Sequence, residues 1–502
     1  MHSVGGRRGT HRDRLHAIVP ARATPERVAS ASALDLLLPA TATGRLIFLS
    51  LEETPVATTV LDSALFRDCF GTPRMRAIFE DRALLARYVE AEVALARAQG
   101  RCGVIPQEAA QEIAARSNAD ALDLEVLRRE TETVGYPILP LVHQLAKMCG
   151  EAGRYLHWGA TTQDIMDTAT VLQVRDALAL IESELADLRS ILVRLAKRHR
   201  DTPMAGRTHL QHALPITFGY KVAVWLAMFD RHAERLAQLR PRVLVGELAG
   251  AAGTLASLGD HGLEVQQAMM EELGLGVPLA TWHVARDGPA EAVNFLGLLT
   301  GSLGKIAYDV MLMASTEFAE VYEPFVKGRG ASSTMPQKRN PISSELILAA
   351  SKAVRQHAGL MLDAMIQDFE RATGPWHAEW IALPESFILS AGALHQATFM
   401  LDGLVVDEQR MRRNLDMTSG LIVAEAVMMS LAPHLGRNEA HDLVYAACRT
   451  VNEKGGTLAG VLAGMPEVSS RLGRQAIERL TDPTNYLGAA PQMVDRVISN
   501  RR

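Results

Sequence analysis

The sequence predicts an all-α fold, with a central bundle of long helices between an N-terminal and a C-terminal helical part. Apolar residues recur three and four positions apart without a break along one stretch, at Val171, Val174, Leu178, Ile181, Leu185, Leu188, Leu192 and Leu195. This seam predicts a helix of about 30 residues, roughly 45 Å long at about 1.5 Å per residue, which needs other long helices beside it. No stretch shows the period-two alternation of β-branched residues that is typical of strands.

The composition is that of an ordinary globular protein. The 502 residues are 48% apolar and 22% charged, and the net charge of -5 comes without any basic stripe, which argues against a nucleic-acid surface. The 4 cysteines are widely spaced, so we expect a reducing compartment and no disulfide frame, zinc site or other metal. No apolar run reaches the roughly 20 residues that cross a bilayer. We therefore expect a cytoplasmic protein that needs no cofactor and binds neither membrane nor nucleic acid.

Four parts follow one another along the chain. Residues 1–60 are rich in arginine and poor in acidic residues, and we expect disorder or a spurious upstream extension there, with an organelle transit peptide as the alternative. Residues 61–160 are expected to form an N-terminal helical domain, because apolar residues at helical spacing begin near Phe79. Residues 161–400 are assigned to the long-helix bundle, and residues 401–502 to a smaller C-terminal helical domain.

The stretch that opens the long helix offers donors for an anion. Between His157 and Asp164 it contains a Gly-Ala step, two threonines and a glutamine. Free N–H groups at a helix N-terminus bind anions, and the hydroxyls of Thr161 and Thr162 add donors. Simple N-capping by Thr or Asp is the alternative, but capping needs neither the histidine nor the glycine. We expect an anion-binding turn here.

A second polar stretch, Gly206–Pro215, lies just ahead of a helix that a proline begins. It combines a glycine turn with hydroxyl, amide and imidazole groups. Histidine exchanges a proton near neutral pH without any perturbation of its pKa. His209 is therefore a candidate for proton transfer, although a single histidine is more often structural, and His212 is open to either role.

The loop 327–344 has the composition of an active-site lid. Its run 328–341 gathers glycines, serines, two prolines, a lysine, two arginines and an asparagine between two apolar helical patterns. Glycines let the backbone swing and prolines fix its bends, while the cations and the amide suit a carboxylate. A surface loop without a role is the alternative, but a neutral linker does not need this mixture. The loop predicts a lid that closes over an anionic substrate.

The run Ser332–Pro341 resembles the signature of the fumarase/aspartase superfamily. That superfamily includes fumarase, aspartase, argininosuccinate lyase, adenylosuccinate lyase and 3-carboxy-cis,cis-muconate cycloisomerase. The similarity runs from about Leu65 to about Val497 and is strongest to the cycloisomerase branch, although the superfamily usually has Gly where this chain has Ala331. The resemblance implies the superfamily's all-α bundle fold, a small dicarboxylate or tricarboxylate substrate, and a homotetramer whose active sites each draw on three chains.

The resemblance also assigns roles residue by residue. Ser332 would be the base that takes the Cβ proton, and His209 would protonate the leaving group or relay its proton. Lys338 and Asn340 would hold the carboxylate that becomes the aci-acid. The other implied substrate contacts are Thr161, Thr162, Gln163, Thr208, Gln211, Ser333, Met335 and Arg339. A serine hydroxyl is a poor base in water, so lid closure, helix dipoles and a nearby lysine must favour its ionised form.

Two other stretches have weaker signals. Gly246–Thr254 is rich in small residues but lacks the spacing and the preceding strand of a phosphate-binding loop, so close backbone packing is favoured. Trp282–Asp287 contains a Trp-His and an Arg-Asp pair that resemble the cycloisomerase branch. These residues either line the pocket or serve the structure.

One departure from the cycloisomerase branch bears on the reaction. That branch commonly has Trp at the position of His209 and no acid after the Asn-Pro pair, whereas this chain has His209 and Glu345. In the eliminating lyases that histidine and that glutamate form a charge-relay pair, in which the carboxylate raises the basicity of the imidazole and fixes its tautomer. Glu345 therefore joins the implied catalytic set.

The sequence thus predicts a lyase that performs β-elimination on a substituted succinate and releases fumarate or a close analogue. The expected leaving group is nitrogenous, such as an amine, a ureido-like group or nitrite. Two alternatives remain open. One is the cycloisomerase itself, whose intramolecular attack of a carboxylate on an alkene is the same chemistry run as an addition. The other is a non-catalytic helical scaffold that has kept the fold.

Overall fold

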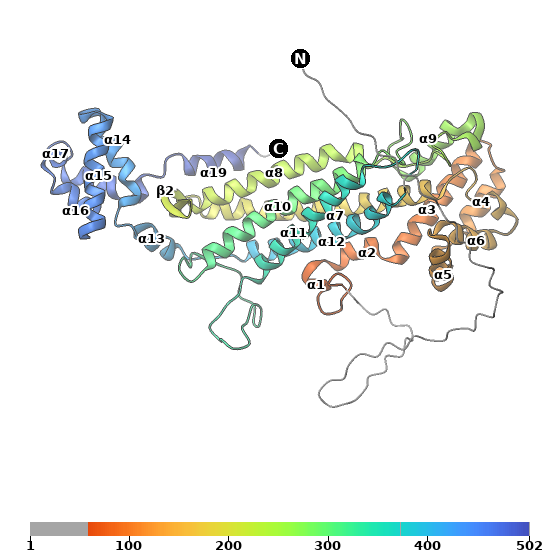
Figure 1. Ribbon diagram of the computed structural model, residues 1–502, viewed down its shortest axis with the longest axis horizontal. Helices are drawn as coiled ribbons and strands as arrows, with labels where there is room; N and C mark the ends of the chain where they lie inside the picture. Colours follow the sequence, from red (N-terminus) through yellow and green to blue (C-terminus); the bar gives the residue numbers. More distant parts are fainter. Residues whose placement is uncertain (1–58, 372, 501–502) are drawn as a thin grey trace, which may run out of the picture. The chain divides into compact units, whose positions relative to one another are not determined.

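Five long helices of the described chain form the central bundle. The computed structural model describes residues 59–371 and 373–500, so the expectation for residues 1–60 lies almost wholly outside the described residues. The bundle helices lie side by side (Figure 1) and are α7 (Thr162–Arg198), α8 (Phe218–Val243), α10 (Asp287–Ala314), α11 (Ile342–Ala364) and α12 (Pro375–Asp402). The all-α prediction is confirmed.

The apolar seam of α7 is buried along its whole predicted length, from Val171 to Leu195. From Val174 on, its side chains pack against those of the neighbouring bundle helices in one continuous core, whereas Val171 belongs to a second core near the start of the helix. The helix has 37 residues, more than the predicted number of about 30. The difference arises because polar contacts, which the apolar pattern does not mark, hold its first turns.

α10 is long and apolar enough to cross a membrane by length and composition alone. Half of its most apolar window is buried in the structure, and Leu296, Leu299 and Leu303 lie in the bundle core. Core helices of globular proteins have the same length and composition, so the burial of α10 favours its assignment as a core helix of the bundle. The predicted cytoplasmic location stays a prediction.

A second apolar core forms where the helices before α7 meet its first turns. Its helices and 3-10 turns are α3 (Asp81–Arg101), α4 (Gln107–Arg116), η1 (Ala119–Ala121), α5 (Leu124–Val134), α6 (Ile138–Cys149) and η2 (Gly150–Tyr155). The two helices before them, α1 (Arg67–Phe70) and α2 (Pro73–Phe79), pack on the bundle core instead. The segment after α8, with η3 (Ala256–His261) and α9 (Gly262–Leu273), joins the same core. This core includes residues on both sides of the domain boundary expected at residue 160, and the boundary stays a prediction.

The chain ends in a series of shorter helices, and those between Val427 and Ile477 share a small core of their own. They are α13 (Glu408–Asp416), η4 (Leu421–Val423), α14 (Ala424–Leu435), α15 (Arg437–Lys454), α16 (Leu458–Ala463), α17 (Pro466–Ser469), α18 (Arg474–Thr481), η5 (Pro483–Asn485) and α19 (Ala490–Ser499). The last of them returns to pack against α8.

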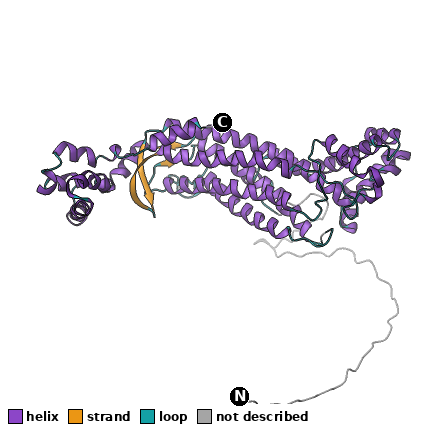
Figure 2. Ribbon diagram, turned by 90° about the horizontal axis from the view of Figure 1, so that it is seen from above, coloured by secondary structure: helices purple, strands orange, loops and turns teal. Residues whose placement is uncertain are grey.

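Two short antiparallel strand pairs interrupt the helices (Figure 2). The first is a hairpin of β1 (Pro203–Thr208) and β2 (Gln211–Thr217), and the second pairs β3 (Val321–Tyr322) with β4 (Val405–Val406). The sequence did not predict the hairpin, because a bulge between Ala205 and Arg207 breaks its register and neither strand alternates polar and apolar residues.

The direction of the chain gives the bundle two ends. At one end, called the turn end, α7 and α12 begin, and Arg371 just before α12 reaches Thr161 just before α7. At the other, called the hairpin end, α7 and α10 finish, and Arg207 in β1 pairs with Glu320 after α10. Helices α8 and α11 therefore begin at the hairpin end and run back to the turn end.

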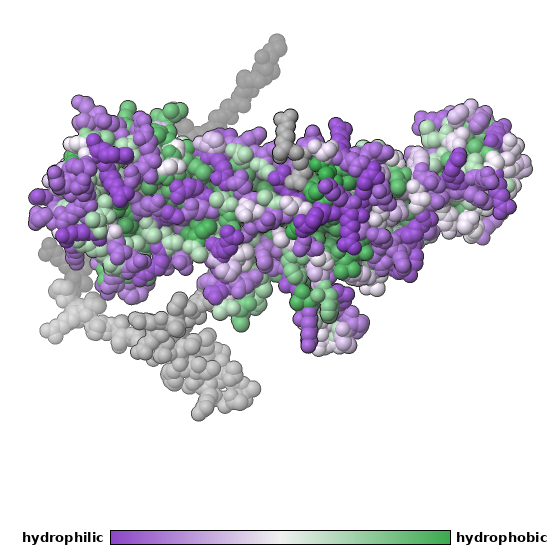
Figure 3. Space-filling view, turned by 180° about the vertical axis from the view of Figure 1, so that it is seen from behind, coloured by the Kyte–Doolittle hydropathy of each residue, from purple (hydrophilic) through white to green (hydrophobic). Residues whose placement is uncertain are grey.

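Apolar side chains also reach the surface of the bundle. Figure 3 shows apolar patches between hydrophilic side chains on one face. The exposed large apolar residues of the bundle helices include Val224, Leu298, Tyr308, Leu360 and Leu362. Surface patches of this kind on a long-helix bundle are typical of helix faces that pack against another chain.

Candidate active site

The first turn of α7 is tied down by one buried carboxylate. Asp164, the third residue of the helix, is fully buried. Its Oδ2 accepts hydrogen bonds from the backbone N–H of Thr161 (2.8 Å) and Gly250 (3.0 Å). Its Oδ1 accepts from Ala249 N–H (2.9 Å) and from the imidazole Nε2 of His283 (2.9 Å). The predicted close packing of the stretch 246–254 is seen at Gly246 and Gly253, where an added Cβ would lie 2.1 Å from a Met270 atom and 2.5 Å from a Thr281 atom.

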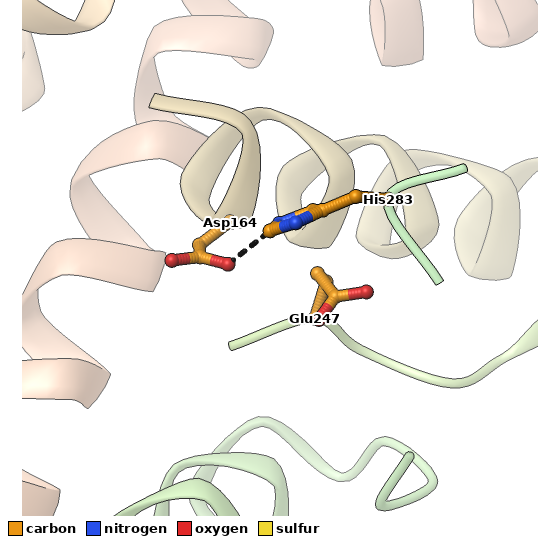
Figure 4. Close-up of side chains that lie close together, drawn as sticks. All are labelled: Asp164, Glu247 and His283. Atoms are coloured by element: carbon orange, nitrogen blue, oxygen red, sulfur yellow. Dashed lines mark hydrogen bonds and ion pairs between the residues drawn. The ribbon is translucent and has the colours of Figure 1, made fainter. Parts of the chain in front are cut away.

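Asp164, His283 and Glu247 come together from three segments (Figure 4). One donor atom of each lies within 4.8 Å of the other two, and all three side chains are buried. Carboxylate and imidazole groups are ligands that a zinc ion accepts. The four hydrogen bonds to Asp164 already use its oxygens, so these residues fit a metal ion poorly.

A second buried network lies one helical turn further along α7. Arg286 makes two hydrogen bonds to Asp167 (2.7 and 2.9 Å) and two to Glu379 in α12 (2.8 and 2.6 Å). The indole of Trp376 also donates to Asp167. Burial would lower the pKa of Arg286, but the two carboxylates raise it above its ordinary value. Arg286, at the start of α10, and Trp376, at the start of α12, thus fix where these two helices meet α7.

The predicted substrate contacts at this end form one turn, Thr161–Gln163, called here the α7 turn. Thr161 and Thr162 are partly exposed. Gln163 is buried, and its amide nitrogen donates to Asp167 (3.1 Å) and to the carbonyl of His283 (2.9 Å). Substrate contact by these three residues stays a prediction.

Arg371 is a residue of this end that the sequence analysis missed. Its guanidinium donates to the Thr161 hydroxyl, although 210 positions separate the two residues. The connection that carries it is shaped by Asp368, which accepts a 3.0 Å hydrogen bond from the backbone N–H of Thr373. A cation beside a helix N-terminus opposes the helix dipole. An anion between them would relieve that opposition, and no sequence motif marked this arginine.

His157 also borders the α7 turn. Its backbone has a positive φ of 55°, and its Nδ1 donates to the buried carboxylate of Glu92 at 2.6 Å. Burial alone would lower the pKa of His157, but Glu92 outweighs that effect and holds the pKa above its ordinary value. The imidazole, 22% exposed, therefore favours its protonated form more than a free histidine does.

The predicted proton-transfer histidine lies at the tip of the β1–β2 hairpin. His209 and Leu210 are the two turn residues, and both have positive φ, 51° and 63°. Two-residue hairpin turns of this form favour Asn and Gly, so two larger side chains carry backbone strain of about 1–3 kcal/mol each. The turn residues and the flanking Thr208 and Gln211 are all exposed.

The hairpin is anchored beneath its tip. Arg207 forms a two-pronged pair with the buried Glu320 (3.0 and 2.6 Å), and Asn414 of α13 donates to the same carboxylate. Burial and the positive charge of Arg207 lower the pKa of His212. His212 lies opposite Arg207 in the hairpin register, a position that favours its structural role.

The lid begins and ends at the same end of the bundle as the hairpin. Glu323, before the lid, accepts from the N–H groups of Ser343 and Ser344 at the start of α11. Arg329 donates to the Ser343 hydroxyl and to Gln396 in α12. These contacts hold the stem of the lid and leave its tip free.

The tip of the lid is largely exposed. Ser332 is partly buried, and its Oγ accepts from the backbone N–H of Thr334 (3.3 Å) and Met335 (3.0 Å). Ser333, Lys338 and Glu345 are exposed, and Met335 is 43% exposed.

The cations and the amide of the lid lie near its stem. Arg339 stacks on the rings of Tyr322 and Phe325, and Asn340 is partly exposed. A hollow lined by these residues has a volume of about 30 Å³, which is room for a few water molecules.

One chain does not bring the three predicted groups together. α7 separates the α7 turn from the hairpin, and its 37 residues span about 55 Å. Within the described chain, no hydrogen bond or ion pair joins His209 to Glu345. The assignment of catalytic and substrate-binding residues stays a prediction.

Comparison with known proteins decides the family. A family model described as "Lyase" matches residues 70–355, and one described as "Adenylosuccinate lyase C-terminus" matches residues 420–497. The crystal structure of a fumarate lyase from Mesorhizobium sp. BNC1 is 59% identical with a TM-score of 0.81, over 86% of this chain and 99% of that one.

The chain belongs to the fumarase/aspartase superfamily, and it is an enzyme. Two curated relatives of the superfamily carry different reactions in their names. Trans-aconitate decarboxylase 1 of Mycosarcoma maydis is 48% identical over 86% of this chain and 88% of its own length. A 3-carboxy-cis,cis-muconate cycloisomerase of Pseudomonas aeruginosa is 47% identical over 87% and 96%. Superfamily membership therefore leaves the reaction open.

Proposed function

We propose that the protein is a lyase that eliminates a nitrogenous group from the β-carbon of a substituted succinate and releases fumarate or a close analogue. The observation that carries the proposal is the group of donors at the turn end of the bundle. There the guanidinium of Arg371 donates to the hydroxyl of Thr161, which caps the N-terminus of α7, and the neighbouring Thr162 is partly exposed. These donors suit one carboxylate of the substrate.

Removal of a proton next to a carboxylate needs a base and a place for the developing charge. In this proposal Ser332 takes the Cβ proton, and the aci-carboxylate forms against Lys338 and Asn340. The Oγ of Ser332 already accepts two backbone hydrogen bonds. Those donors would stabilise an alkoxide in the same place.

The departing nitrogen needs a proton, and His209 supplies it in this proposal. The strained turn holds the imidazole at the hairpin tip, and the Arg207–Glu320 pair fixes the hairpin behind it. Glu345 is the partner that would orient the imidazole. The presence of both residues favours elimination over cycloisomerisation, because the cycloisomerase branch commonly lacks both.

We infer that the complete site forms between chains of a homotetramer. The α7 turn lies about 55 Å from the hairpin along α7, so the groups assigned to these two segments cannot meet within one chain. The exposed apolar residues of α8, α10 and α11 offer the surface for association. In the assembly, the turn of one chain would meet the hairpin and the lid of two others.

The second candidate is the cycloisomerase reaction, which the 47% identity to a muconate cycloisomerase favours. The fumarate lyase structure at 59% identity favours the elimination. One assay separates them. Fumarate has an ultraviolet absorbance that rises during elimination, whereas the diene absorbance of 3-carboxymuconate falls during lactonisation.

The test offers the purified full chain one compound at a time. Aspartate, a ureido-substituted succinate and nitrosuccinate test the elimination, and 3-carboxymuconate and aconitate test the alternative reactions. We expect fumarate release from one of the succinates and no turnover by the Ser332→Ala variant. Consumption of the diene alone would establish the cycloisomerase reaction. Decarboxylation of aconitate alone would contradict both.

A further inference from the structure

Two buried polar side chains of α3 hold the chain just ahead of the α7 turn. Glu92 and Gln99 lie two helical turns apart on one face of α3, and neither has any exposed surface. Oε1 of Glu92 accepts from Nδ1 of His157 at 2.6 Å, and the amide of Gln99 donates to the carbonyl of Trp158, also at 2.6 Å. Burial of a polar group is unfavourable unless it is bonded, so these two contacts favour a single position of the step His157–Trp158.

The backbone of that step is strained. His157 has a φ of 55°, which is unfavourable for a residue other than glycine. The N–H of Ala160 donates to the His157 carbonyl at 3.4 Å, so the chain turns there and leads directly into Thr161, the first residue of the α7 turn. Strain of this kind persists only where the surroundings hold it, and the two α3 contacts supply that hold.

The contact with Glu92 decides what the other ring nitrogen of His157 can do. A carboxylate can only accept, so Nδ1 carries a proton. Within the described chain, Nε2 makes no hydrogen bond, and the side chain is 22% exposed. In the neutral ring with Nδ1 protonated, Nε2 is an acceptor, and it becomes a donor only when the ring is positively charged. His157 can therefore donate to a carboxylate ligand only as the imidazolium.

We propose that Glu92 is a positioning residue that acts through His157: it orients the imidazole beside the α7 turn and keeps it positively charged, so that Nε2 donates to the substrate carboxylate bound there. This inference rests on the proposed function, because it assigns the α7 turn to carboxylate binding. Gln99 fixes the backbone of the same step and so supports the orientation of the ring.

Two carboxylates act on the charge of His157. Burial alone would lower the pKa of His157, but the charge of Glu92, with a smaller contribution from Asp164 of α7, raises it above the ordinary value. Asp164 makes no hydrogen bond to this imidazole, because its oxygens accept from three backbone N–H groups and from His283. Glu92 is therefore the direct partner of the ring.

The basic groups of the other neighbouring segments are engaged elsewhere. Arg371, just before α12, donates to the α7 turn. Arg154 of η2 is paired with Glu151. His283, which follows α9 in the chain, donates to the carboxylate at the third residue of α7. In the described chain, none of these groups bonds to Glu92 in place of His157.

The pH range of the effect follows from the sign of the pKa shift. A histidine whose pKa is raised in the folded state contributes stability that is complete below its ordinary pKa of 6.5 and is lost as the pH rises through the folded-state value. The contribution of its charge to carboxylate binding is lost over the same range. Without the charge of Glu92, burial is left to lower the pKa, so the loss moves to lower pH.

Glu92→Gln separates the orientation of the ring from its charge. The glutamine carbonyl can still accept from Nδ1, so the ring keeps its orientation and loses its anionic partner. We expect the Kd for succinate, measured by calorimetry on the full chain, to be at least about 5-fold weaker than the wild-type value near pH 7.5. The two values should converge as the pH falls to about 6.

Glu90→Gln is the matched control. It is the same substitution on the same helix, in a partly exposed pair with Arg87. This variant should bind succinate as the wild type does at both pH values.

Proton uptake gives a readout that a purely structural role would not move. Calorimetry near pH 7.5 in buffers of different ionisation enthalpy counts the protons bound together with succinate. We expect Glu92→Gln to take up more protons than the wild type, up to about one more, because its imidazole must be charged on binding. His157→Gln should lack this extra uptake and bind weakly at both pH values, because it has no cation to offer.

Equal proton uptake and parallel Kd profiles of wild type and Glu92→Gln would overturn the positioning role and leave the proposed function intact. An equal loss of affinity at both pH values without extra proton uptake would show a structural role only, and would overturn it as well. No succinate binding by the wild type at any pH would contradict the proposed function, and the positioning role with it.

Discussion

The α7 turn and the lid carry complementary parts of the candidate site and are built in opposite ways. Beneath the α7 turn, the single carboxylate of Asp164 receives four hydrogen bonds from three separate segments. In the lid, the hydrogen bonds of the Ser332 hydroxyl within the described chain are all to Thr334 and Met335 of its own loop. The stem of the lid is held by Glu323 and Arg329, while most of its tip is exposed.

The α7 turn and the lid differ in how many contacts hold their polar groups, because one is expected to bind the substrate and the other to move. A carboxylate site works best when its donors are fixed before the substrate arrives, because no reorganisation is then needed. A loop that must close needs few contacts in its open state. Directional polar bonds fix the first turns of α7, whereas apolar packing is enough for the rest of the helix.

Replacement of the lid serine should separate catalysis from stability most sharply. Ser332→Ala removes the proposed base, and we expect kcat to fall at least about 1000-fold. Because Ser332 contacts only its own loop, the melting temperature should not change. The control is Ser190→Ala, an exposed serine in α7 that bonds to the Ala186 carbonyl. Retained turnover would refute the base.

Removal of the carboxylate beneath the α7 turn should lower the stability of the fold. Asp164→Asn leaves four buried donors facing an amide that can accept with one oxygen only, so we expect a loss of about 2–4 kcal/mol of unfolding free energy. Chemical denaturation measures it. An unchanged midpoint would mean that the turn is not held by this carboxylate.

Arg371 tests whether the α7 turn contributes to substrate binding rather than to the chemical step. Arg371→Met removes a charged donor next to Thr161, and we expect KM to rise about 10- to 100-fold with a smaller change in kcat. Steady-state kinetics on the best substrate distinguishes the two effects. Arg116→Met, in an exposed pair with Glu112, should change neither constant.

A substitution at Gly330 tests whether the lid depends on the backbone conformation of its stem. Its φ is 68°, and a Cβ there would lie 2.5 Å from the carbonyl oxygen of Asn340. Gly330→Ala should therefore shift the lid stem and lower kcat about 5- to 10-fold. Gly328→Ala has a similar positive φ but meets no atom within 4 Å, so it separates the clash from the backbone strain. Equal effects of the two variants would exclude the clash as the cause.

The sequence by itself determined the long helix, the all-α class and the family. These properties are local or repetitive: the apolar seam from Val171 to Leu195 fixes a helix wherever it packs, and the lid motif is one contiguous run. The same locality explains why the proposed turn, the His209 stretch and the lid could each be marked as polar segments.

Only the tertiary structure decided which groups meet. Arg371 reaches Thr161, and Glu247 approaches Asp164, across 210 and 83 positions of the chain, and nothing in either local pattern announces the other. The β1–β2 hairpin likewise takes its form from pairing rather than from alternation. Such contacts depend on how helices are brought side by side, because a side chain's partner is chosen by packing in space and not by its neighbours in sequence.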